Sequence, residues 1–191
     1  APQGIQGNCS TPYVAPDAID PEIGKQNVLD LLLLPEDQRI AWLGAHVWPH
    51  EAKLLAAVAD GIRSVDPKAR FATHMSQSLS PTFALAFYKA MADGGFAPDR
   101  IGFSYYPTAT DFPDRAKRFR DTVIAVQDHF GRPVFIAEVA YPAGPTPEGP
   151  YATWTTPIPK YPVSEDGQAA FLRDLTSWAV ASGAAGIRPW G

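Results

Sequence analysis

The chain has 191 residues and a formal net charge of −4, from 16 basic and 20 acidic side chains. This length is short for two full-sized domains and ample for one buried core, so we expect one domain over residues 1–191, with an irregular segment at 1–17. Apolar residues make up 46% and charged residues 19%, a balance that argues against wholesale disorder. The negative charge, without a basic stripe, argues against a nucleic-acid partner.

Membrane insertion and disulfide bonding are also excluded by the sequence. The longest apolar run, residues 28–34, is interrupted by Asp30 and is far shorter than the roughly 20 residues that span a bilayer. A single cysteine, Cys9, excludes an internal disulfide and zinc sites built from several thiolates. The chain starts without a basic and apolar leader, so we expect a mature form after signal cleavage or an excised fragment.

From residue 50 onward, helical and strand patterns alternate along the chain. Residues 51–65 are predicted to be helical, because their large apolar side chains recur at 3.6-residue spacing on one stripe; these are Leu54, Leu55, Val58, Ile62 and Val65. Further helices are predicted at about 81–91, from the segment after Asp111 to Phe130, and from Ser164 onward. Strands are predicted at 69–74, 100–106, 133–140 and 186–190, and a long stiff loop with seven prolines at 141–163.

Strands that alternate with helices in this order, and that are apolar on both faces, predict a parallel sheet covered by helices. The fold class is therefore α/β. The first fifty residues are harder to interpret: residues 18–24 could form a further strand, and residues 28–34 with Trp42 a helix or an apolar loop. At most five strands are predicted.

Three of the predicted strands end in polar or aromatic side chains. His74, Tyr105 and Glu138 are 31 and 33 residues apart, about one strand-helix repeat. Such groups point from the carboxyl edge of one sheet, where barrels and open α/β sheets place their sites.

Glu138 carries the most weight among these residues. The apolar run before it directs the strand into the core and leaves a carboxylate at the rim, which is costly unless it is hydrogen-bonded or functional. The alternative is a strand-end glutamate that simply reaches solvent. A carboxylate among Tyr, Trp and His side chains is typical of a carbohydrate site, because sugar rings present apolar faces to aromatic planes and hydroxyls to polar groups.

Several short stretches also resemble a known family. They are Ile23-Gly24-Lys25-Gln26, Trp48-Pro49, Thr73-His74, Gly102-Phe-Ser-Tyr-Tyr-Pro107, Ala137-Glu-Val-Ala-Tyr-Pro142 and a closing Gly186…Trp190. In this order they are similar to the strand ends of the endo-β-1,4-galactanases, glycoside hydrolase family 53. The resemblance runs from about residue 19 to the end, and its Ser-Tyr-Tyr-Pro and Ala-Glu stretches are the most specific.

This resemblance implies a (β/α)₈ TIM-barrel type fold and retaining cleavage of β-1,4-galactan in plant arabinogalactan, outside the cell and without a cofactor. It makes Glu138 the nucleophile at the end of the seventh barrel strand. A retaining mechanism needs a second carboxyl group about 5–5.5 Å away, which the family takes from an Ile-Gly-Asn-Glu stretch. The residues that the resemblance assigns to sugar binding are His74, Tyr105, Tyr106, Trp48 and, as a stacking platform, Trp190.

At the position of the second carboxyl group this chain has Gln26, preceded by Lys25. Glutamine has no proton to give, so acid-assisted cleavage should be impaired and sugar binding preserved. Three explanations compete: an engineered trapping mutant, a natural sugar binder without catalysis, or an enzyme whose acid comes from elsewhere, such as Glu22 or Glu51. The first two are favoured, because Glu22 precedes the motif and Glu51 starts a helix.

Two alternatives lie outside hydrolysis. A non-catalytic glycan-binding or structural half-barrel would keep the fold without the reaction. An unrelated doubly wound α/β domain would have no affinity for glycans.

The chain is also short for a full barrel, which usually takes about 250 residues. The predicted strands match the second half of the barrel. A half-barrel exposes two apolar edges, so we expect a homodimer or a missing N-terminal half.

Metal and nucleotide sites find little support. His46 and His50 have the spacing of a helical metal pair, but Pro49 disfavours a regular helix and no third ligand is evident, so no metal is expected. Glycine pairs follow helices instead of opening them, which argues against a phosphate-binding loop.

Overall fold

The computed structural model describes residues 19–75, 79–108, 113–145 and 156–189. Their contacts divide the chain into two compact units. The N-terminal unit contains the chain up to residue 68 together with 86–97, and the C-terminal unit contains 69–85 and the chain from residue 98. The single domain over 1–191 stays a prediction, and its irregular segment 1–17 lies outside the described residues.

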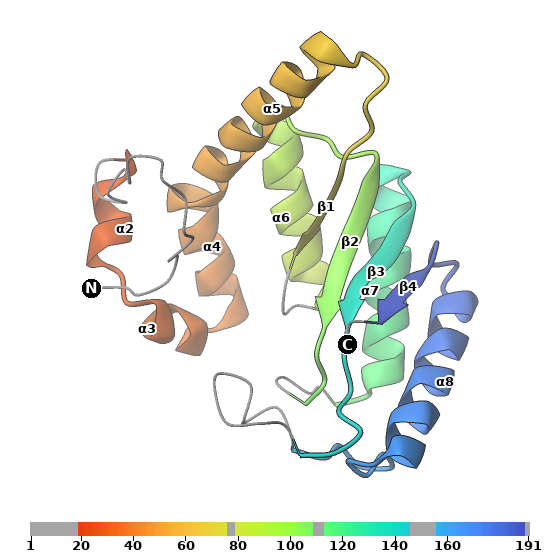
Figure 1. Ribbon diagram of the computed structural model, residues 1–191. Helices are drawn as coiled ribbons and strands as arrows, with labels where there is room; N and C mark the ends of the chain where they lie inside the picture. The colour runs from red at the N-terminus through yellow and green to blue at the C-terminus, as the bar shows by residue number, and fades with distance from the viewer. Residues whose placement is uncertain (1–18, 76–78, 109–112, 146–155, 190–191) are drawn as a thin grey trace. The chain divides into compact units, whose positions relative to one another are not determined.

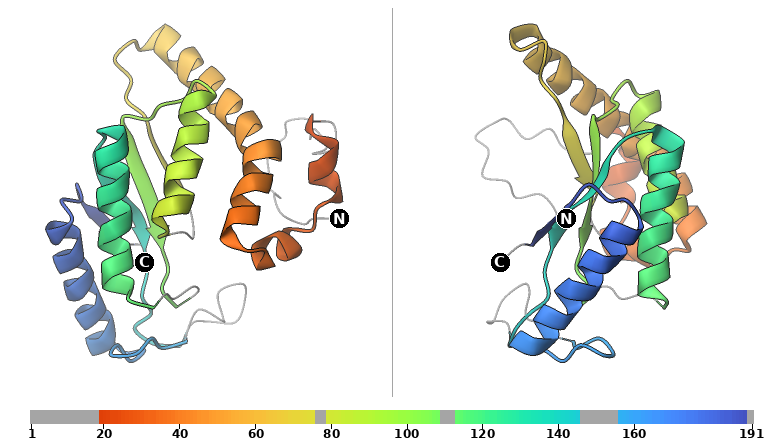
Figure 2. Two further views of the ribbon diagram at one scale, coloured as in Figure 1. Left: turned by 180° about the vertical axis from the view of Figure 1, so that it is seen from behind. Right: turned by 90° about the vertical axis from the view of Figure 1, so that its right-hand side faces the viewer.

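A parallel sheet forms the centre of the C-terminal unit (Figure 1). Its strands, in spatial as in chain order, are β1 (Ala72–Met75), β2 (Arg100–Tyr105), β3 (Val134–Val139) and β4 (Ile187–Pro189). The helices that follow the first three strands are α6 (Pro81–Asp93), α7 (Arg115–Phe130) and α8 (Glu165–Ala181). Seen from behind, α7 lies in front of the strands (Figure 2). The predicted α/β class is thus confirmed, as are the strands and helices predicted from residue 69 onward.

The helices of this unit begin and end at residues that favour such boundaries. Ser164 caps α8 by accepting a hydrogen bond from the Gly167 N–H at 3.1 Å. α7 ends at Gly131, whose φ of +61° is in the left-handed region that glycine adopts readily. Side chains from β2, β3, α7 and α8 then form the core; those with at most 1% exposure include Ile101, Phe103, Phe119, Val123, Val126, Val134, Ile136, Phe171 and Leu175.

A one-residue slip in the pairing of β3 decides which way Glu138 points. Phe103 of β2 pairs with Ile136, but the next residue, Ser104, pairs with Glu138, so Ala137 is an extra residue. Burial alternates along β3 until Ala137 and Glu138, which are both half-buried. Because successive side chains point to opposite faces of a strand, the slip turns Glu138 away from the face that buries Ile136.

The described part of the N-terminal unit is helical. Its elements are α2 (Pro21–Lys25), α3 (Val28–Leu33), α4 (Glu36–His46), α5 (Trp48–Val65) and the second half of α6. The predicted strand over residues 18–24 is therefore wrong. Asp20 caps α2 by accepting a hydrogen bond from the Glu22 N–H at 2.9 Å, and Pro21 occupies the first turn, where its fixed φ suits a helix. For residues 28–34, helix is the alternative that the structure adopts.

Helix α5 buries two alanines and exposes most of its large aliphatic side chains. Ala52 and Ala59 are buried, as is Trp48, which packs edge-on against Phe87. A Cβ atom on Gly94 would lie 2.3 Å from the Ala52 Cβ, so only small residues permit this approach. The apolar stripe of an amphipathic helix normally faces the core, but here Leu55 is half-buried and the other four members are 44–88% exposed: Leu54, Val58, Ile62 and Val65.

Candidate active site

Glu138 is held by hydrogen bonds at the carboxyl edge of the sheet. The hydroxyl of Tyr106 donates to Glu138 Oε2 at 2.5 Å, and Ser104 Oγ donates to the same oxygen at 3.3 Å. Both donors come from the end of β2, the strand beside β3. Glu138 is half-buried and accepts protein hydrogen bonds, so the alternative of a glutamate that merely reaches solvent does not describe it.

His74 joins this carboxylate through Ser104. His74 Nδ1 lies 2.8 Å from Ser104 Oγ, across the pair of strands β1 and β2. The partner of His74 in this pairing is Gly102, and a Cβ atom there would lie 2.6 Å from the His74 Cβ. Three neighbouring strands therefore bring together His74, Ser104, Tyr106 and Glu138, which we call the Glu138 cluster. The sequence had singled out all of these except Ser104, which occurs in the family-like Ser-Tyr-Tyr-Pro stretch.

The two tyrosines of that stretch have different surroundings. Tyr106 contacts Glu138, whereas Tyr105 is 2% exposed and its ring packs 6.4 Å from Phe119 and 6.0 Å from Phe171. Tyr105 thus contributes to the core between α7 and α8. Its assignment to the sugar subsite stays a prediction, and one that this packing does not favour.

The segment after Glu138 is fixed to α8. The ring of Tyr141 stacks on Phe171, with centroids 4.9 Å apart. The hydroxyl of Tyr141 donates to the Tyr161 carbonyl, and Gln168 Nε2 donates to the Tyr141 carbonyl at 2.6 Å. These contacts hold the segment that follows Glu138 against α8 and residue Tyr161.

An ion pair adds to this anchor. Asp174 accepts hydrogen bonds from Lys160 Nζ at 2.5 Å and from the Tyr161 hydroxyl at 2.6 Å. The bond from Lys160, followed by that from Tyr161, holds the pKa of Asp174 below its usual value. Burial is the main cause that raises the pKa of Tyr161.

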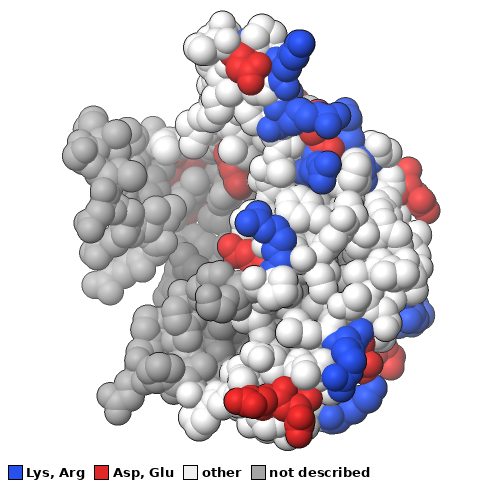
Figure 3. Space-filling view, turned by 45° about the vertical axis from the view of Figure 1, so that its right-hand side comes forward, with Lys and Arg blue, Asp and Glu red and all other residues white. Residues whose placement is uncertain are grey.

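On the face shown in Figure 3, basic and acidic side chains lie beside each other, which is typical of a solvated surface.

The other sequence-predicted site residues belong to the N-terminal unit or are not described. Gln26 follows α2 and its Nε2 donates to the Asn27 carbonyl at 3.1 Å. Trp48 is 4% exposed and takes part in packing, as described above, so its sugar-binding role stays a prediction. Trp190 lies outside the described residues. The pairing of Gln26 with Glu138 also stays a prediction.

The two glutamates considered as replacement acids differ in their surroundings. Glu22 is exposed and pairs with Lys25 at 2.6 Å. Glu51, in the first turn of α5, is half-buried, and this burial raises its pKa. A raised pKa is the property that a general acid needs, so Glu51 is the better of the two on this criterion.

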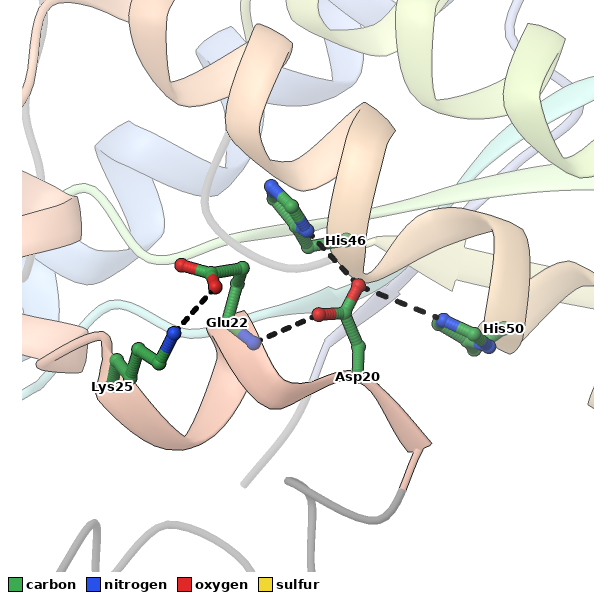
Figure 4. Close-up of polar contacts among 5 residues, drawn as sticks. All are labelled: Asp20, Glu22, Lys25, His46 and His50. Atoms are coloured by element: carbon green, nitrogen blue, oxygen red, sulfur yellow. Dashed lines mark hydrogen bonds and ion pairs between the residues drawn. The ribbon is translucent and has the colours of Figure 1, made fainter.

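The two histidines of the His-x-x-x-His pair converge on one carboxylate (Figure 4). His46 Nδ1 donates to Asp20 Oδ2 at 2.9 Å, and His50 Nε2 lies 3.9 Å from the same oxygen. The bond from His46, with a smaller part from the Glu22 N–H, holds the pKa of Asp20 below its usual value. Among the residues described, no three His, Cys, Asp or Glu side chains form a group that could hold a metal ion. The contact ties α2 to α4 and α5.

The length and apolar character of the helices decide whether any of them could span a membrane. Within the described ranges, none combines the length and the apolar character needed to cross a bilayer.

Comparison with known proteins places these observations in a family. The model of glycosyl hydrolase family 53 matches residues 23–190. An arabinogalactan endo-β-1,4-galactanase from Cellvibrio japonicus is 26% identical over 177 residues, which are 88% of this chain and 45% of that protein. An uncharacterised protein from the bgaB 5′ region of Niallia circulans is 28% identical over 134 residues, which are 67% of this chain and 35% of that protein.

Solved structures agree with the sequence matches. The GH53 catalytic domain of Ignisphaera aggregans superposes with a TM-score of 0.62 at 24% identity, over 75% of this chain and 41% of that one. A structure from a study of two fungal β-1,4-galactanases gives 0.57 at 19% identity, over 75% and 45%. The chain thus spans less than half the length of each relative, which confirms the expectation of a partial barrel-type fold. With a family model that matches nearly its whole length, the chain belongs to glycosyl hydrolase family 53.

Proposed function

We propose that this chain binds β-1,4-linked galactan and carries the nucleophile of a retaining glycoside hydrolase. The observation that supports this most directly is Glu138, which accepts hydrogen bonds from Tyr106 and Ser104 at the carboxyl edge of a parallel sheet. Active sites of barrel folds lie at this edge. The substrate class follows from the family and from the galactanase relative, in which a matching region accounts for about half of the chain.

In the proposed reaction the Glu138 carboxylate attacks the anomeric carbon and the glycosidic bond to the leaving oxygen breaks. This gives a covalent glycosyl-enzyme that water then hydrolyses. The hydrogen bonds from Tyr106 and Ser104 orient the carboxylate for attack. Departure of the leaving oxygen needs a proton, and later a base must activate water, two tasks that Gln26 cannot perform. We therefore infer that this chain binds galactan but cleaves it poorly.

Reducing-end release from galactan tests this proposal in three forms of the chain. The unmodified chain should release little, Gln26→Glu should release more, and Gln26→Glu combined with Glu138→Gln should return to the low level. Affinity for a galactan oligosaccharide, measured by calorimetry, should be present in all three forms. Activity of the double variant equal to that of Gln26→Glu would contradict the role of Glu138.

A second candidate, a glycan-binding half-barrel without catalysis, is favoured by the presence of Gln26. It predicts oligosaccharide affinity in every form and release in none, including Gln26→Glu. If the acid comes from elsewhere instead, Glu51→Gln in the otherwise unmodified chain should abolish release, since Glu51 has the raised pKa. Absence of both affinity and release would favour a structural role.

The proposal includes a partner for the sheet, either a second copy of this chain or the remaining half of a barrel. Sedimentation over a range of concentrations distinguishes a homodimer from a monomer. It also includes an extracellular location, because a polymeric galactan does not enter a cell intact. Cell fractionation tests this part.

A further inference from the structure

One buried hydroxyl stands between an imidazole and a carboxylate in the Glu138 cluster. Ser104 Oγ lies 2.8 Å from His74 Nδ1 and 3.3 Å from Glu138 Oε2, and Ser104 is only 2% exposed. A serine hydroxyl has one proton to donate and lone pairs to accept. It donates either to His74 or to Glu138, but not fully to both. We propose that the Ser104 hydroxyl acts as a relay between His74 and Glu138. In this relay His74 is a positioning residue, because its Nδ1 decides whether the Ser104 hydroxyl donates its hydrogen bond to Glu138.

The proton on His74 Nδ1 selects between two arrangements. When Nδ1 carries no proton, it accepts the Ser104 hydroxyl, and Glu138 keeps the Tyr106 hydrogen bond from this cluster. When Nδ1 is protonated, it donates to Ser104, whose own proton then turns to Glu138. The carboxylate now accepts hydrogen bonds from both Ser104 and Tyr106, which fixes its orientation.

The surroundings of the two residues suit these roles. His74 is exposed on β1, so solvent can exchange protons with its ring, whereas Ser104 lies in the interior, where water does not replace its partners. Among the described residues, those at this end of β2 and β3 that carry titratable groups are Tyr105, buried in the core, together with Tyr106 and Glu138. Asp99 and Arg100 lie at the other end of β2, where Arg100 pairs with Ala72.

The consequence for chemistry rests on the proposed function. Protonation of His74 would add a donor to the nucleophile and fix the orientation of its carboxylate. It would thereby link the orientation of Glu138 to a residue that does not touch it directly.

The relay is tested without any sugar, by ¹⁵N NMR of the His74 ring in the whole chain. Glu138→Gln should shift the His74 Nδ1 signal, because the change is transmitted through Ser104. The matched control is Glu165→Gln, which removes the same charge from an exposed position in the first turn of α8 and should leave the signal in place. The same Glu138→Gln comparison is then made in a Ser104→Ala background.

In that background the Glu138→Gln shift should be lost. A shift that persists undiminished overturns the relay, since the coupling would then be a charge effect through space. The relay is also overturned if Glu138→Gln leaves the His74 Nδ1 signal unchanged.

A second variant keeps the test independent of Ser104→Ala folding. His74→Asn places an amide N–H near the position of Nδ1 and donates at every pH. The ¹³C signal of the Glu138 carboxyl carbon should show a step in the unmodified chain where His74 titrates, and should lose that step in His74→Asn. A step that survives in His74→Asn overturns the relay. Loss of galactan binding with the coupling intact would count against the proposed function alone.

Discussion

Gly102 makes room for the Glu138 cluster because it has no side chain. It pairs with His74 across β1 and β2, and an added Cβ atom would lie 2.6 Å from the His74 Cβ and 3.2 Å from the Phe135 ring. Backbone strands cannot easily separate to relieve such a contact without loss of their hydrogen bonds. The His74 side chain therefore owes its position to the glycine beside it.

Replacement of Gly102 by alanine should displace His74 and destabilise the chain by about 1–3 kcal/mol, the usual cost of overpacking. Urea denaturation measures the loss, and the His74 ring signal reports the displacement. Gly186→Ala is the matched control, since a Cβ atom there meets nothing within 4 Å. An equal loss in both variants would show that the effect comes from the backbone and not from contact with His74.

At the scale of elements, β3 shows why a strand can be predicted while the direction of its key side chain cannot. Simple alternation groups Glu138 with Val134 and Ile136, whose side chains are buried in the core. The slip at Ala137 moves Glu138 to the opposite face, beside Ser104. Such a bulge depends on pairing with a neighbouring strand, so the composition of residues 133–140 alone does not reveal it.

The N-terminal helices show a second limit of pattern reasoning. The apolar stripe of α5 predicted the helix correctly but not its buried face, because close approach to Gly94 selects the Ala52 side instead. The prediction of a strand over residues 18–24 was wrong for a local reason. The Asp20 cap and Pro21 at the first turn favour a helix there, and these signals outweigh the short apolar pattern.

The exposure of large aliphatic side chains on α5 leads to a stability prediction. Leu54 is 66% exposed, so Leu54→Lys should change the free energy of unfolding by no more than about 0.5 kcal/mol. Gly94→Ala should cost about 1–3 kcal/mol, because its new Cβ atom would collide with Ala52. Chemical denaturation of both variants checks this. A large loss in Leu54→Lys would mean that the stripe is covered in solution, and sedimentation would then show whether a second copy covers it.

At the scale of the whole molecule, the described part of each unit includes a carboxylate whose pKa is lowered by its partners. Asp20 in the N-terminal unit is held by His46, and Asp174 in the C-terminal unit by Lys160 and Tyr161. A carboxyl group with a lowered pKa in the folded state stabilises the fold above its unfolded pKa, about 3.9. That stabilisation is lost as the pH falls through the folded value. Both units should therefore lose stability below about pH 4.

Asparagine replacements reveal whether the two units unfold together. Asp20→Asn should remove part of the acid dependence from the N-terminal unit, and Asp174→Asn from the C-terminal unit, because an amide does not titrate. Backbone amide NMR signals of α4 and α8, followed between pH 6 and about pH 3, report the two units separately. If each replacement alters only its own unit, the units unfold independently. If either replacement alters both, they form one cooperative domain, as the length of the chain predicts, because a change in one unit reaches the other only through shared packing.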